Sequence, residues 1–68
     1  MMWITPEEAY DMYARFWAAR HGSSAVPAAR EAAKMHERRG DHEGFVAWTE
    51  VADRIERRRR AETSDALS

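Results

Sequence analysis

The side chains best suited to chemistry are three histidines and the acidic residues beside them. His36 and His42 flank a turn that also holds Asp41 and Glu43, whereas His21 lies beside the first glycine. Helices that bind metals place their ligands three or four residues apart, so that the ligands share a face. These histidines lack that spacing, and we therefore predict no metal site.

The same turn, residues 40–44, has a composition that a catalytic loop could use. Ordinary structural roles also explain this composition: Gly40 can stop one helix, Asp41 can cap the next, and Glu43 suits the positive end of its dipole. No nucleophile has a suitable base, no glycine-rich phosphate loop is present, and the chain contains no cysteine. A hairpin this small is also expected to offer no deep cleft of roughly 300 Å³ or more, which substrates usually need. We predict a protein that is not an enzyme, with no catalytic residues and no cofactor.

A run of arginines is the strongest charge feature of the chain. It comprises Arg54, Arg57, Arg58, Arg59 and Arg60. Such a run could contact phosphates or an acidic partner. Nearby acids dilute it, no aromatic residue interleaves with it, and the formal net charge is −1, which argues against a dedicated nucleic-acid binder. The structural alternative is a group of cations that complements the carbonyl end of a solvated helix.

Aromatic residues are concentrated near the N-terminus, where five of the seven lie within the first seventeen positions. The segment at 9–19 is apolar almost all round, with Asp11 and Arg15 as its polar stripe. A helix packed on one hairpin needs an apolar arc of roughly 100°, and this arc is wider. Either alanines fill the extra arc and the tyrosine hydroxyls reach water, or the helix has a second buried face.

The second possibility leads to a specific interface. The line predicted to face the neighbouring helix is Ala9, Met12, Phe16 and Ala19. The residues then left for a partner are Tyr10, Tyr13 and Trp17. Because Trp and Tyr are enriched at the centres of interfaces, we predict a homo-oligomer, with a dimer favoured.

Start and stop signals define the elements that position these residues. Residues 5–8 supply a capping hydroxyl, a proline at the first helical position and a glutamate three residues after the cap, while Gly22 and Gly40 end helices. The predicted helices cover about residues 6–20, 25–39 and 42–60. The fold class is therefore all-α, a small three-helix domain over 1–60 followed by a frayed polar tail at 61–68.

Short connections make successive helices antiparallel, so the second and third helices should form a helical hairpin. Asp41 can cap the third helix. Alanines on the second helix, such as Ala29 and Ala33, leave room for the third helix to approach. We expect Phe45 and Trp48 to lie across them.

Two resemblances accompany this pattern. Within residues 28–55, a pattern made of Gly40-Asp41, Glu43, Trp48, Ala52 and Ile55 resembles one hairpin of a tetratricopeptide-type unit. Such arrays need about three repeats, so a repeat protein is not implied. A longer pattern consists of His21-Gly22, the alanines at 25, 29 and 32, Gly40-Asp41, Glu43-Gly44, Trp48 and Ile55. This pattern resembles a group of short alphaproteobacterial helical proteins, for which no activity is established. This resemblance implies a helical fold and no particular function.

The sequence thus favours a non-enzymatic interaction or structural module that self-associates through its first helix. The alternative is an accessory binder of nucleic acid or of an acidic partner, which would use the arginine run. Pairing with an unknown heterologous protein also stays open, and an enzyme is the third hypothesis. No apolar run is long enough to span a bilayer and no secretory signal begins the chain, so we expect a cytoplasmic protein without a membrane partner.

Overall fold

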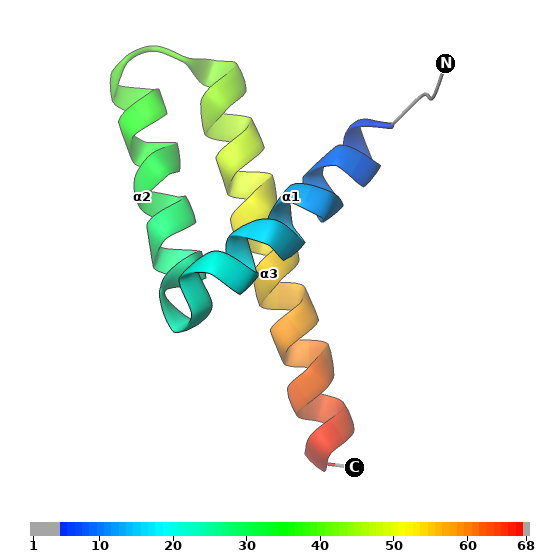
Figure 1. The fold of residues 1–68 in the computed structure, drawn as a ribbon. Helices are drawn as coiled ribbons and strands as arrows, with labels where there is room; N and C mark the ends of the chain where they lie inside the picture. The colour runs from blue at the N-terminus through cyan, green and yellow to red at the C-terminus, as the bar shows by residue number, and fades with distance from the viewer. Residues whose placement is uncertain (1–4, 68) are drawn as a thin grey trace.

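The computed structural model describes the backbone of residues 5–67 and the side chains of residues 5–63. Its elements are α1 (Pro6–His21), a short 3-10 turn η1 (Gly22–Ser24), α2 (Ala25–Arg38) and α3 (His42–Leu67) (Figure 1). No strand occurs between residues 5 and 67, which confirms the predicted all-α class. Over the same range, no helix combines the length and the apolar character that crossing a membrane requires.

The connection between the first two predicted helices is itself helical. Because η1 joins α1 directly to α2, helical backbone continues without a break from residue 6 to residue 38. Gly22 takes a φ of 56°, which redirects the chain at this elbow. The described chain therefore consists of two uninterrupted helical stretches, 6–38 and 42–67, and the loop expected before residue 25 is absent.

The predicted end of the last helix at residue 60 is wrong, because α3 continues to Leu67. Residues 61–67 contain neither glycine nor proline, so the chain carries no strong signal that would stop a helix. Thr63 also donates its hydroxyl to the carbonyl of Arg59 at 2.9 Å. The C-terminal part of α3 consequently projects beyond the other two helices (Figure 1).

Helices α2 and α3 form the expected antiparallel hairpin, and small residues fill its interface. Ala25 and Ala29 of α2 and Ala52 of α3 are completely buried. Val51 and Ile55 complete the buried part of α3, whereas Phe45 and Trp48 are only half-buried. Aliphatic residues, rather than the predicted aromatic pair, are thus the most deeply buried part of α3.

A capped turn closes the hairpin. Gly40 has a φ of 78°, and Asp41 accepts a hydrogen bond from the backbone N–H of Gly44 at 3.0 Å, which confirms the predicted cap of α3. The other carboxylate oxygen of Asp41 lies 2.8 Å from Nδ1 of His36. A Cβ added to Gly44 would lie 2.5 Å from the same nitrogen, so this position suits a glycine.

Candidate interaction surface

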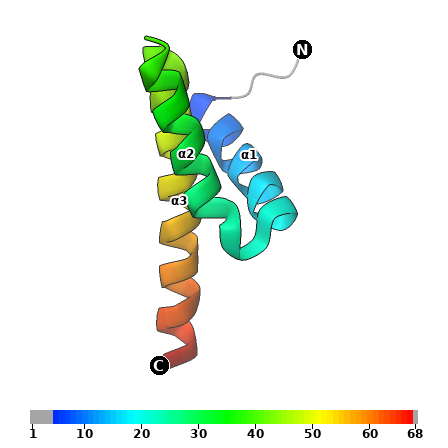
Figure 2. The same cartoon turned by 90° about the vertical axis from the view of Figure 1, so that its left-hand side faces the viewer.

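Helix α1 crosses one side of the hairpin and presents the candidate surface (Figures 1 and 2). Its first turn is set by the capping box that the sequence predicts. The Thr5 hydroxyl accepts from the Glu8 backbone N–H at 3.1 Å, and the Glu8 carboxylate accepts from the Thr5 N–H at 3.4 Å. This cap defines where the helix begins, but the packing of its two faces decides its orientation.

The inner face of α1 is centred on Ala14, which is 1 % exposed. The indole N–H of Trp17 donates to the carbonyl of Ala25 at 2.9 Å and ties α1 to the start of α2. The rings of Trp17 and Trp48 meet edge to face, with their centroids 4.7 Å apart, and Tyr13 meets Trp48 in the same way at 5.5 Å. An aromatic cluster therefore attaches α1 to α3.

The outer face of α1 is also apolar. Met12 is 58 % exposed and Phe16 is 59 % exposed, and Ala9 and Ala19 beside them are exposed as well. We call these four residues the outer face. Large apolar side chains that are mostly in water are ordinary when they are isolated, but a contiguous apolar patch often marks a binding surface.

The predicted orientation of α1 is wrong. The line of Ala9, Met12, Phe16 and Ala19 was expected to pack inside and instead points outward. Ala14, which the prediction did not single out, is almost fully buried against the hairpin. The Trp17 indole N–H has its acceptor, the Ala25 carbonyl, on the same inner side. A wide apolar arc shows that two faces exist, but it does not show which one docks.

The predicted interface residues consequently lie on the inner or flanking side of α1. Trp17 and Tyr10 are half-buried, and the guanidinium of Arg54 lies 5.9 Å from the centre of the Tyr10 ring. Tyr13 keeps 44 % of its surface exposed while its ring contacts Trp48. Of the three, Tyr13 alone still offers a large surface to a partner.

Tyr13 also borders an apolar groove of about 310 Å³ between α1 and the first half of α3. Ala9 and Tyr10 line one wall, and Ala47 and Trp48 line the other. A second cleft, of about 380 Å³, lies between α1 and the projecting end of α3. Both hollows lie open at the surface, because α1 crosses the hairpin obliquely and leaves space beside it. Neither is the deep cleft that the sequence-based argument addressed.

The predicted anionic-partner residues do not form one basic strip. Arg54 lies against Tyr10 and 3.8 Å from the Glu50 carboxylate. Arg57 donates to the backbone carbonyl of Asp53 at 3.4 Å. Arg58 and Arg59 line the larger cleft instead. The helix thus distributes the run around its circumference.

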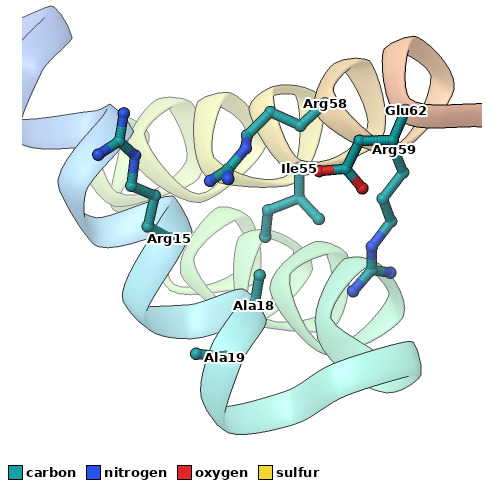
Figure 3. Close-up of a pocket in the computed structure, with 7 residues that line it drawn as sticks. All are labelled: Arg15, Ala18, Ala19, Ile55, Arg58, Arg59 and Glu62. Carbon is teal, nitrogen blue, oxygen red and sulfur yellow. The ribbon is translucent and has the colours of Figure 1, made fainter. Parts of the chain in front are cut away.

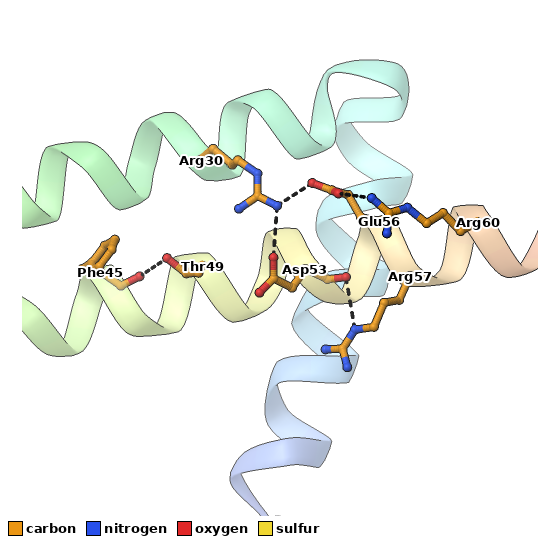
Figure 4. A network of polar contacts seen from close by, with 7 residues as sticks. All are labelled: Arg30, Phe45, Thr49, Asp53, Glu56, Arg57 and Arg60. Carbon is orange, nitrogen blue, oxygen red and sulfur yellow. Dashed lines mark hydrogen bonds and ion pairs between the residues drawn. The ribbon is translucent and has the colours of Figure 1, made fainter.

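Arg60 belongs to an ion-pair network that joins the two arms of the hairpin (Figure 4). Arg30 of α2 binds Asp53 at 3.0 Å and also Glu56, which in turn pairs with Arg60 at 3.4 Å. The hydrogen bond to Glu56, followed by that to Asp53, raises the pKa of Arg30. These cations are neutralised within the chain and are poorly suited to bind an external anion.

The histidines remain apart. The His21 ring packs against Trp17 at a tilt, with ring centroids 3.9 Å apart, and His36 pairs with Asp41. His42 lies near Phe45. Among residues 5–63, no group of three side chains from His, Asp and Glu is placed to hold a metal ion.

Comparison of the chain with family models, with curated proteins and with solved structures finds no match. The resemblances to the alphaproteobacterial group and to the tetratricopeptide hairpin therefore remain predictions.

Proposed function

We propose that this chain is a non-enzymatic protein–protein interaction module that pairs with a second copy of itself through the outer face of α1. The observation that carries the proposal is the exposure of Met12 and Phe16, at 58 % and 59 %, on a helix whose opposite face is already packed. Burying a side chain of this kind contributes about 1.5–3 kcal/mol. The structure supports a different set of contact residues from the tyrosines and tryptophan predicted from sequence.

The charges of α1 favour a second copy of the chain as the partner that binds the outer face. The first turn of α1 carries the exposed Glu7 and Glu8, and its last turn carries the exposed Arg20, whereas His21 packs on Trp17. Two α1 helices packed antiparallel about a two-fold axis place the acidic end of each beside the basic end of the other. A parallel pair would place like charges together. We therefore propose an antiparallel α1–α1 contact, with apolar side chains at its centre and ion pairs at its ends.

Sedimentation equilibrium of matched methionine variants tests this proposal. The parent should approach twice the monomer mass at high micromolar concentration, and Met12→Glu should remain monomeric. Met35→Glu is the control, because Met35 is 50 % exposed on α2, away from the outer face, and this variant should dimerise like the parent.

Each alternative result has a clear meaning. A monomeric parent at high micromolar concentration refutes self-association. Equal weakening by both methionine substitutions places the contact elsewhere. Since the central contacts are apolar, raising the salt concentration should weaken the dimer much less than Met12→Glu does.

A further inference from the structure

The cleft on the other side of α1 from the apolar groove differs from it in charge. It is open, has a volume of about 380 Å³, and lies between α1 and the projecting part of α3 (Figure 3). Arg15 reaches it from α1, and Arg58 and Arg59 reach it from α3. Ala18 and Ile55 contribute apolar lining, so cationic side chains surround a small apolar floor.

The positive charge in this cleft is only partly neutralised. Glu62 is the one acidic residue that lines it among the described side chains. Arg15 pairs outside the cleft with Asp11 at 3.3 Å, and Arg59 donates to the carbonyl of Gly22. No acidic side chain within residues 5–63 lies within ion-pair distance of Arg58. Among the described side chains, Arg58 is thus exposed, charged and without an acidic partner.

A neighbouring hollow on α3 provides the contrast. It has a similar size, about 360 Å³, but its two arginines, Arg57 and Arg60, face three acids from the same helix. There the chain supplies its own counterions. In the Arg15–Arg58–Arg59 cleft, like charges converge from two helices, and a bound anion would relieve their mutual repulsion.

We propose that the Arg15–Arg58–Arg59 cleft binds a small organic anion, a phosphate or carboxylate group attached to a short apolar body. Guanidinium groups donate two parallel hydrogen bonds to such oxyanions, which lysine does not. The apolar body lies over Ala18 and Ala19, and the volume falls within the range of small-molecule sites. Ala19 is shared with the outer face of α1, but none of the three arginines belongs to that face, and the site does not require a dimer.

Titration with two small probes, followed by amide chemical shifts at low salt, tests the site. Phenyl phosphate and 3-phenylpropionate carry the two candidate headgroups, and benzyl alcohol carries the apolar body without a charge. We expect saturable shifts at α1 and at the C-terminal half of α3 with at least one anion. The alcohol should give none. The tighter of the two anions identifies the preferred headgroup.

Matched arginine variants then assign the binding to the cleft. Arg58→Gln should raise the dissociation constant about tenfold, equivalent to about 1.4 kcal/mol, and Arg58→Lys should raise it less. Arg57→Gln is the control, because Arg57 lies next to Arg58 in the chain but lines the other hollow. Thermal melts should superpose for the three variants, since both positions are exposed.

Three results would overturn the proposal. The first is the absence of saturable shifts with either anion. The second is equal weakening by Arg57→Gln and Arg58→Gln, which would indicate general attraction to a basic helix. The third is competition by a short single-stranded oligonucleotide that binds more tightly than both probes and depends equally on both arginines, which would indicate a nucleic-acid surface instead.

Discussion

The α2–α3 hairpin and helix α1 are held in place by opposite kinds of side chain. Small residues such as Ala29 and Ala52 join the arms of the hairpin, and an ion-pair network centred on Arg30 bridges them. Helix α1 instead docks through large rings, with Trp17 against Trp48. Helix α1 leaves Phe16 59 % exposed, whereas the large apolar side chains that the described part of the hairpin exposes, Met35 and Val46, are 50 % and 41 % exposed.

The two kinds of packing serve different purposes in this small fold, namely defining the backbone geometry and burying apolar area. Close backbone approach between alanines gives the hairpin a defined geometry, but it buries little apolar area. Aromatic side chains bury more area per residue, and α1 has enough of them to supply one face to the hairpin and another to a partner. We infer that the hairpin defines the shape of the molecule and that α1 defines what it associates with.

The largest expected effect comes from enlarging a residue at the tight interface. Ala52 is completely buried, so Ala52→Leu should destabilise the fold by about 2 kcal/mol through overpacking. For a domain of this size the melting temperature should fall by about 8–16 °C. The control is Ala47→Leu, at a half-buried position that lines the apolar groove between α1 and α3. This substitution should lower the melting temperature much less. Equal shifts would mean that the alanine contacts do not define the hairpin.

A smaller effect should follow from removing the hydrogen bond that anchors α1. Trp17→Phe retains an aromatic ring but loses the donor to the Ala25 carbonyl, which should cost about 1 kcal/mol. Hydrogen exchange should accelerate in α1 more than in α2 or α3. Trp48→Phe is the matched control, since it makes the same change in the aromatic cluster on the α3 side. Uniform acceleration in all three helices would show that α1 and the hairpin open together.

The smallest effect concerns pH and the hairpin turn. The N–H of Gly44 and the ring of His36 bind the carboxylate and hold the pKa of Asp41 below its ordinary value. A lowered folded-state pKa stabilises the fold above the unfolded-state pKa, and this contribution is lost as the pH falls through the folded-state value, below about pH 4. Between pH 6 and pH 3, the melting temperature of the parent should therefore fall modestly more than that of Asp41→Asn. A larger fall in melting temperature for Asp41→Asn would contradict a stabilising role of the Asp41 carboxylate.

Local signals in the sequence predicted the helix boundaries well wherever a cap or a glycine was present. Thr5, Gly40 and Asp41 act through backbone hydrogen bonds with near neighbours, so their effect can be read without knowledge of tertiary contacts. The end of α3 differs from the prediction for the converse reason: a polar composition alone does not stop a helix, and residues 61–67 contain neither glycine nor proline.

The candidate site was less predictable, because it depends on which apolar face of α1 docks. Hydrophobic periodicity does not distinguish two apolar faces, and the choice rests on the small size of Ala14 and on a carbonyl acceptor from another helix. Arg15 was missed as a cleft residue for a similar reason. Its proximity to Arg58 arises only from the crossing of α1 and α3, which no spacing in the chain reveals.

The elbow at Gly22 has a consequence for the order in which the molecule folds. Arg59 reaches the carbonyl of Gly22 across 37 residues, whereas the hairpin turn joins residues only a few positions apart. Closing a long loop costs more chain entropy than closing a short one, so the hairpin can form early. We expect docking of α1 to be the late step, and newly made chains would then expose both apolar faces of α1 until α3 has been completed.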